Sequence, residues 1–211
     1  MEKGELYVRR PALTVCEDEI ERIVDMIVSC HRSGGKILLC GNGGSSADCE
    51  HIAGELLKGF RLRREMTGGE KAAFRSALGD EAAPLIASLQ RGIPVIPLPS
   101  LTGVCTAYAN DASPELVFAQ EVFSLGKPGD LLIGITTSGN SANVVAALKT
   151  AHAMGITTAA LTGERRGKAD GFSDVTVHVP ASETYIVQEY HLSVYHYICA
   201  RVEKLLFGDG K

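Results

Sequence analysis

Residues 130–161 read DLLIGITTSGNSANVVAALKTAHAMGITTAAL, and the alternation of short apolar runs with a helical segment indicates the fold class. Its apolar run at 130–135 is too short for a helix and predicts a buried strand. A helical segment at 141–154 follows, and a second strand-like run occupies 157–161. Two strands joined by a helix of this length pair in parallel through a right-handed crossover. The stretch therefore predicts an α/β fold built on a parallel sheet.

The same alternation continues in both directions from this stretch. Short apolar runs predict further strands at 36–40, 93–98 and 175–179. Helical periodicity and helix-start signals predict helices at 14–32, 46–58, 114–123 and 183–206. We therefore expect a three-layer, doubly wound parallel sheet of the flavodoxin-like kind, with an N-terminal helix and a long C-terminal helix. In such folds ligands bind at the carboxyl ends of the strands.

Length and composition limit the class of protein. The 211 residues favour a single domain over 1–211, in which the segment 61–91 is less tied to the sheet and is expected to be an insertion. A net charge of −4 argues against a nucleic-acid partner. No apolar run approaches the roughly 18 residues of a spanning helix, and no signal-peptide pattern opens the chain, so we expect no membrane partner and a cytoplasmic location. Six cysteines without a C-x-x-C pair predict reduced thiols.

Hydroxyl groups gather in the loop that follows the strand at 130–135. Four of them precede or begin the helix at 141–154, and they belong to Thr136, Thr137, Ser138 and Ser141. Backbone N–H groups at a helix N-terminus and these hydroxyls are donors for an anion, and Gly139 allows a close backbone approach. The loop therefore predicts a phosphate site. The plainer alternative is that Ser138 or Ser141 only caps the helix.

A second loop, Gly41-Asn-Gly-Gly-Ser-Ser46, follows the strand at 36–40. It invites comparison with the dinucleotide-binding pattern G-x-G-x-x-G, but Ser46 stands where the third glycine is needed. We therefore do not expect a dinucleotide. Asn42, Gly43 and Gly44 are expected to offer amide and backbone donors to sugar hydroxyls.

Candidate metal ligands lie on two of the predicted helices. His51 and Glu55 are four residues apart, which places them on one face, as zinc ligands or as an ordinary surface pair. Gln188 and His196 are eight residues apart, so they lie about 12 Å apart along a straight helix. Sharing one ion would require a bend, converging side chains or a second subunit. His191 is either a residue that supports the site or a core histidine.

The cluster of Lys58, Arg61, Arg63 and Arg64 is the strongest concentration of positive charge near these helices. Such a cluster is usually a solvated face, although it can also attract a second phosphate or a partner protein. We expect the solvated face.

Together these motifs resemble the sedoheptulose 7-phosphate isomerase (phosphoheptose isomerase) family of sugar-isomerase, or SIS, domains. The resemblance spans most of the chain and rests on Cys40-Gly-Asn-Gly-Gly-Ser45, His51-x-x-x-Glu55, Asn110-Asp111, Thr137-Ser-Gly-Asn-Ser-Ala-Asn143, and Gln188-Glu-x-His191 with His196. It implies a zinc ion held by His51, Glu55, Gln188 and His196. It also implies a substrate phosphate at Thr136, Thr137, Ser138 and Ser141, and a sugar pocket lined by Asn42, Gly43, Gly44, Glu55, Asn110, Asp111 and Gln188.

The activity implied by the resemblance is an aldose-ketose isomerisation. Sedoheptulose 7-phosphate would become D-glycero-D-manno-heptose 7-phosphate through an enediolate, in bacterial heptose and lipopolysaccharide biosynthesis, with Glu55 as base and His196 as acid. Glu189 and Asp111 are alternative bases. A homotetramer with sites at subunit interfaces is implied as well.

Two features depart from the family pattern. Thr136 stands where serine is common, and the segment after Phe60 is longer than in the family's short form. The longer segment leaves the identity of the substrate open, because it could cover the site as a lid, extend an oligomer interface or bind another protein. Two other functions stay open as well, an isomerase of another sugar phosphate and a non-catalytic SIS module that binds a phosphosugar or a protein.

Overall fold

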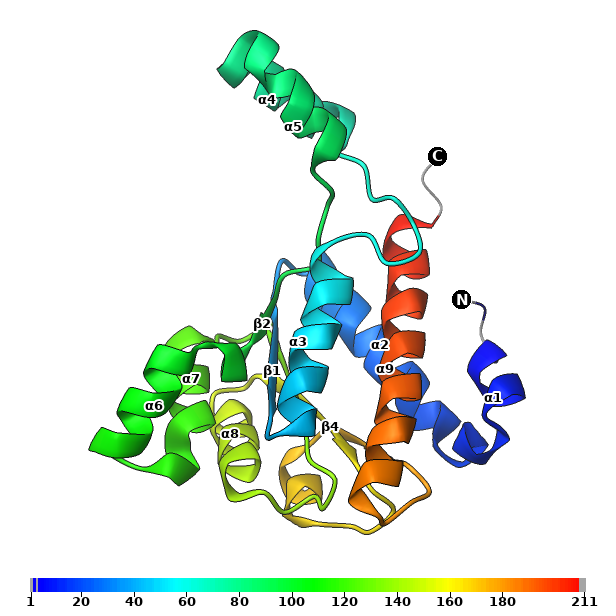
Figure 1. Ribbon diagram of the computed structural model, residues 1–211, viewed down its shortest axis with the longest axis vertical. Helices are drawn as coiled ribbons and strands as arrows, with labels where there is room; N and C mark the ends of the chain where they lie inside the picture. Colours follow the sequence, from blue (N-terminus) through cyan, green and yellow to red (C-terminus); the bar gives the residue numbers. More distant parts are fainter. Residues whose placement is uncertain (1, 3, 209–211) are drawn as a thin grey trace.

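Five parallel strands form one sheet in the order β2-β1-β3-β4-β5. The computed structural model describes residues 2 and 4–208 (Figure 1). The strands are β1 (Ile37–Gly41), β2 (Val95–Pro97), β3 (Leu131–Ile135), β4 (Thr157–Thr162) and β5 (Val175–His178). Each paired strand runs parallel to its neighbour, and Ile37 of β1 aligns with Leu131 of β3. This order is the flavodoxin-like one, so the predicted doubly wound α/β fold is confirmed.

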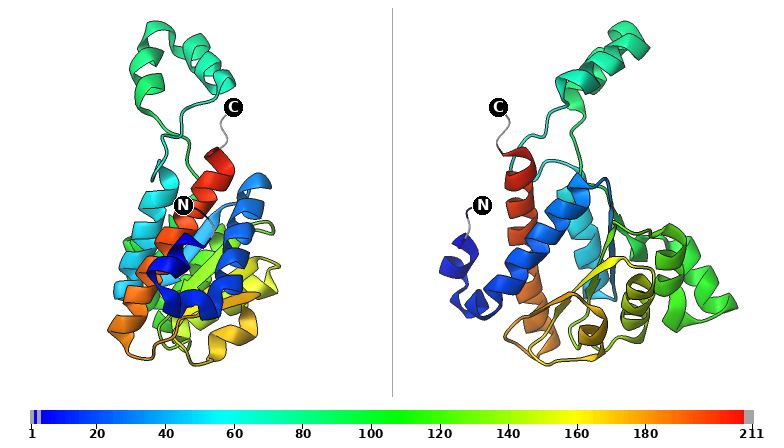
Figure 2. Two further views of the ribbon diagram at one scale, coloured as in Figure 1. Left: turned by 90° about the vertical axis from the view of Figure 1, so that its right-hand side faces the viewer. Right: turned by 180° about the vertical axis from the view of Figure 1, so that it is seen from behind.

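Alternate residues of the central strands β1, β3 and β4 enter two separate cores, because successive side chains point to opposite faces of a sheet. Leu39 packs with the helices of one layer and Leu38 with those of the other. Figure 2 shows the two helical layers from the side and from behind. The first layer holds α1 (Glu5–Arg9), α2 (Glu17–Arg32), α3 (Gly44–Leu57) and α9 (Thr184–Phe207), and the second holds α6 (Thr102–Asp111), α7 (Val117–Leu125) and α8 (Ala142–Ala153). Short 3₁₀ helices lie at Pro11–Cys16, Gly79–Glu81, Leu98–Ser100, Pro114–Leu116 and Lys168–Phe172.

The part of the segment 61–91 that contains the helices projects away from both layers as an arm (Figure 1). It contains α4 (Gly68–Leu78) and α5 (Ala82–Ser88), and α4 begins with a capping box between Thr67 and Glu70. Within the described residues, α4 buries no side chain and α5 buries only Ala82. The arm therefore lies outside the hydrophobic core, and its origin as an insertion stays a prediction.

The largest difference from the sequence prediction is α6, for which no helix was expected. Its residues are all exposed or half-buried, and it contains Gly103 and β-branched side chains, so its apolar residues show no helical period. The predicted helix at 114–123 begins as a 3₁₀ turn and becomes α-helical only at Val117. The short helix α1 was not predicted either.

No helix in the described part of the chain is both long enough and apolar enough to cross a bilayer. All six cysteines lie in that part and are free thiols. Burial raises the pKa of each of these thiols, and five of the side chains are buried in the core.

Asp130 ties together the amino ends of β1 and β3. Its carboxylate accepts hydrogen bonds from the backbone N–H groups of Lys36 and Lys127, both at 2.9 Å, and pairs with the Lys36 ammonium at 2.6 Å. Burial disfavours the charged carboxylate, but these hydrogen bonds outweigh it and hold the pKa of Asp130 below its ordinary value of 3.8. The stabilisation is therefore present above that pH and is lost as the pH falls through the folded-state pKa.

We expect Asp130→Asn to lower the free energy of unfolding by about 2 kcal/mol at pH 7, because an amide cannot accept from all three donors. Urea denaturation of both proteins measures this difference. The difference should shrink as the pH is lowered below 3.8, and a pH-independent difference would contradict the assignment.

Candidate active site

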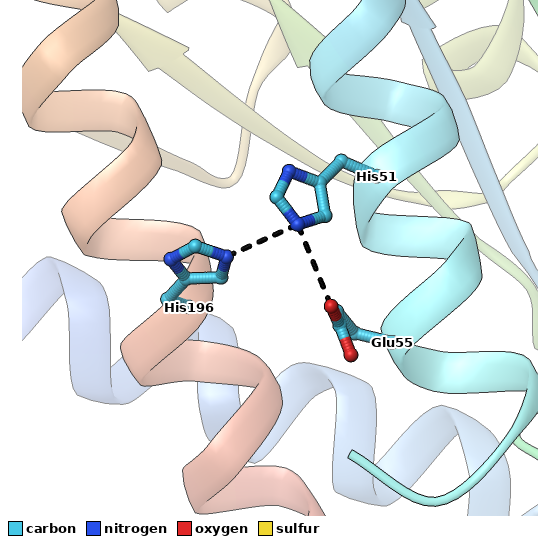
Figure 3. A group of neighbouring side chains, drawn as sticks. All are labelled: His51, Glu55 and His196. Atoms are coloured by element: carbon cyan, nitrogen blue, oxygen red, sulfur yellow. Dashed lines mark hydrogen bonds and ion pairs between the residues drawn. The ribbon is translucent and has the colours of Figure 1, made fainter.

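His51, Glu55 and His196 converge between two neighbouring helices (Figure 3). His51 and Glu55 lie one turn apart on α3, and His196 reaches across from α9. The Nε2 atom of His51 is 3.2 Å from Nε2 of His196 and 3.4 Å from Oε1 of Glu55. One potential ligand atom from each residue lies within 4.8 Å of the other two. The surface-pair alternative is therefore incomplete, because a third residue joins the pair.

The donor set fits a zinc ion. Imidazole nitrogen and carboxylate oxygen are usual zinc ligands, and three protein ligands with an open position are typical of catalytic zinc. Bonds of about 2.0–2.1 Å in a tetrahedron place ligand atoms about 3.3 Å apart, close to the two distances from Nε2 of His51 to its neighbours. The three residues therefore fit a zinc ion by their donor atoms and by these two distances.

Neighbouring side chains fix the histidine rings. The Tyr195 hydroxyl lies 2.9 Å from Nδ1 of His51, which leaves Nε2 directed at the other two residues. Phe60 stacks on the His196 ring with a centroid separation of 5.8 Å. Burial and the neighbouring His51 lower the pKa of His196. Burial also raises the pKa of Asp48, three residues before His51. The His196 ring is thus partly desolvated, whereas the His51 side chain is 43% exposed.

Gln188, the fourth predicted ligand, lies apart from this cluster. Its carboxamide packs on Gly44 at the start of α3, where an added Cβ would sit 2.4 Å from Gln188 Nε2. Gly44 and His51 are seven residues apart, which is about 10 Å along the helix. Gln188 and His196 are likewise separated along the single helix α9, by eight residues. Within one chain the structure therefore brings together three of the four predicted ligands. The role of Gln188 in metal binding stays a prediction.

The loop between β3 and α8 holds the predicted phosphate-binding residues. Thr136 is buried, and its Oγ1 lies 2.9 Å from Oγ of Ser141. Ser141 is the N-cap residue of α8, yet its side chain makes no capping hydrogen bond. The Ser138 hydroxyl accepts a bond from the Asn140 N–H at 3.1 Å, inside the loop. The backbone carbonyl of Thr137 accepts a hydrogen bond from the Gly163 N–H, and the Thr137 hydroxyl takes no part in this contact. Simple capping of α8 by Ser141 is therefore wrong.

The loops after β1 and β3 are joined directly. Asn42 and Asn143 exchange two amide hydrogen bonds of 2.8 Å, one in each direction. Gly43, next to Asn42, takes a positive φ of 54° and opens α3. The predicted sugar-binding residues of the first loop thus lie beside the predicted phosphate loop, at the carboxyl edge of the sheet.

Asn110 and Asp111 lie elsewhere. Both are exposed at the end of α6, where the Asn110 amide donates to the Asp111 carboxylate at 2.8 Å. Both ribbon figures show α6 on the side of α3 away from α9. A single chain therefore does not bring these two residues to the His51 cluster. His191 is fully buried with Nε2 3.2 Å from the Thr162 carbonyl, and burial lowers its pKa to about 4, so it is a core histidine.

Three residues of the site had no predicted role: Asn143, Tyr195 and Phe60. Asn143 ends the loop motif that begins at Thr137, so its polar side chain was a usable signal in the sequence. Tyr195 and Phe60 touch the histidines through tertiary contacts that no spacing in the sequence reveals.

The chain is similar to known proteins of one family. The SIS domain family matches residues 12–91 and 91–163. A phosphoheptose isomerase of Clostridium acetobutylicum is 38% identical over 192 residues, which cover 91% of this chain and 85% of that protein. One from Roseiflexus sp. is 38% identical over 98% of this chain and 92% of that protein.

Solved structures agree as well. The phosphoheptose isomerase of Neisseria gonorrhoeae superposes with a TM-score of 0.72 at 31% identity, over 92% of this chain and 91% of that one. The enzyme from Francisella tularensis gives a TM-score of 0.77 at 26% identity, over 95% and 93% of the two chains.

Fold, loops and matches thus define a protein with a SIS domain. Within that class, this chain belongs to the phosphoheptose isomerase family of sugar-phosphate isomerases.

Gly139 offers a test of the phosphate loop. It has a φ of +67°, and a Cβ there would lie 3.3 Å from Gly167 Cα. Because a left-handed alanine costs about 1–2 kcal/mol, we expect Gly139→Ala to deform the loop and weaken binding of inorganic phosphate about tenfold, as measured by calorimetry. Gly155→Ala is the matched control, with φ +68° and no atom within 4 Å of its Cβ. Equal phosphate affinity in both variants would refute the assignment.

Proposed function

We propose that this chain converts sedoheptulose 7-phosphate to D-glycero-D-manno-heptose 7-phosphate, as a cytoplasmic enzyme of bacterial heptose and lipopolysaccharide biosynthesis. The observation that carries the proposal is the convergence of His51, Glu55 and His196 at one point in a member of this family. A carboxylate and imidazole groups at one site are the groups that proton transfer between neighbouring carbons requires.

The spacing of the two subsites supports a long substrate. The phosphate loop adjoins the start of α3 through the pair of Asn42 and Asn143, whereas His51 and Glu55 lie two to three turns further along α3. In a heptose 7-phosphate the reacting carbons and the phosphate are at opposite ends of the sugar. The loop would thus hold the phosphate while C1 and C2 reach the His51 cluster.

The reaction is assigned to two side chains of the cluster. The Glu55 carboxylate removes a proton from C1 of the ketose, and the resulting enediolate takes up a proton at C2, with His196 as the acid. A zinc ion held by His51, Glu55 and His196 would supply Lewis-acid stabilisation of the negative charge on the substrate oxygens. A carboxylate that also held this cation would be a weaker base, which is the chemical conflict in assigning both roles to Glu55.

A homotetramer with sites at subunit interfaces remains part of the proposal. Asn110 and Asp111 are exposed and distant from the His51 cluster of their own chain. If both residues line the sugar pocket, a neighbouring subunit has to provide them.

Glu55→Gln tests the base. We expect the variant to fold normally but to lose at least about 100-fold in turnover, because general-base catalysis contributes roughly 10²–10⁴. Incorporation of solvent deuterium into the aldose, followed by NMR with seven-, six- and five-carbon ketose phosphates, measures the loss and the substrate preference. Near-normal exchange in the variant would remove Glu55 from this role.

Metal analysis tests the zinc site. We expect zinc in the purified protein, loss of activity after chelation and recovery on adding Zn²⁺. His196→Ala should lower zinc occupancy, whereas Glu189→Gln, an exposed position on the same helix, should not. Full activity in protein shown to be free of metal would contradict the zinc proposal.

A further inference from the structure

Arg64 and Glu203 form a buried ion pair near the carboxyl ends of α3 and α9. Nε of Arg64 lies 2.9 Å from Oε1 of Glu203, and the two side chains are 0% and 1% exposed. The prediction of a solvated basic cluster is therefore wrong for Arg64, although Arg61 and Arg63 are exposed. A buried ion pair is weak evidence for stability, because desolvation offsets its attraction. Its hydrogen bonds to the surrounding chain indicate what it does.

The Arg64 guanidinium caps the end of α3. It donates to the carbonyl oxygens of Leu56 at 2.6 Å and Glu55 at 3.0 Å. The last carbonyls of a helix have no partner within it, and a positive charge there is favourable. Arg64 thus binds the backbone of the proposed base itself, one turn from His51.

The Glu203 carboxylate holds the chain that leaves α3. It accepts hydrogen bonds from the N–H groups of Phe60 and Arg61, both at 2.7 Å, and of Leu62 at 3.1 Å. Phe60 in turn stacks on the imidazole of His196 with an interplanar angle of 23°. Glu203 follows His196 by seven residues, two turns along the same face of α9. The carboxylate therefore fixes the aromatic ring that packs against the proposed acid.

We infer that Arg64 and Glu203 are positioning residues that set the distance between the Glu55 carboxylate and the His196 imidazole. One pair reaches both groups, Glu55 through its carbonyl and His196 through Phe60. This inference rests on the proposed function for its catalytic meaning, but the geometry that it concerns can be measured without substrate.

Arg64→Lys and Glu203→Gln are the variants that test it. Lysine keeps the charge but lacks the fork that reaches Glu203, Glu55 and Leu56 at once, and glutamine loses acceptors for the N–H groups of the loop. Binding of Co²⁺, with its visible absorption spectrum, reports ligand geometry at the cluster, and kcat and KM report the reaction. We expect Co²⁺ affinity and kcat each to fall about 10–100-fold, with an altered spectrum and little change in KM.

Asp130→Asn is the matched control, because it removes a buried carboxylate of similar hydrogen bonding whose partners, Lys36 and Lys127, precede β1 and β3 rather than belonging to α3 or α9. It should lower stability while leaving Co²⁺ binding and kcat unchanged. If it reproduces the losses of the two variants, or if both variants keep wild-type Co²⁺ binding and kcat, the positioning role is overturned.

If the single variants do not fold, the double variant Arg64→Met with Glu203→Leu replaces them in the test. It is expected to fold, because an apolar pair leaves no unpaired charge in the interior. Wild-type Co²⁺ affinity and kcat in this double variant would also overturn the inference. If the unaltered chain binds Co²⁺ but isomerises no sugar phosphate, the proposed function fails. The Co²⁺-binding measurements alone then decide the positioning role. An unaltered chain with neither property would remove both.

Discussion

The candidate site depends on the parallel packing of α3 against α9. Both helices start at the carboxyl edge of the sheet, and successive pairs meet along them: Gly44 with Gln188, His51 with His196, and the end of α3 with Glu203. Because 3.6 residues make a turn in each helix, spacings of seven and eight residues keep these pairs on the facing sides. A shift of one residue between the helices would turn the histidines away from each other. The ion pair at the far end opposes such a shift.

Much of the fold follows from the sequence because strands and long helices have strong local patterns. The run 131–135, enclosed by polar residues and rich in leucine and isoleucine, predicted β3 almost to the residue. The helix α6 was missed because nothing in it is buried, and burial is what produces an apolar period. The arm at 61–91 was recognised as different for a related reason, since its helices carry few of the apolar residues that face a sheet.

The site was predictable only in part. Spacing placed His51 and Glu55 on one face of a helix, and the resemblance to a family added His196, but the contact between α3 and α9 is a tertiary fact. Arg64 shows the limit most clearly. Within the sequence it is one basic residue among several, and its burial depends on Glu203, which is 139 positions away in the chain. A charge cluster cannot be divided into solvated and buried members until the partner is known.

The six free cysteines can report local unfolding of the regions that bury them. Their thiols are held protonated at neutral pH, and five lie inside the core, whereas a reagent such as a maleimide attacks accessible thiolate. Cys49 lies on the inner face of α3 and Cys199 on that of α9, so their modification requires these two helices to separate from the core. Alkylation rates resolved by mass spectrometry would thus compare local opening of the layer that carries the site with opening of the second layer, which covers Cys40 of β1. No engineered label is needed.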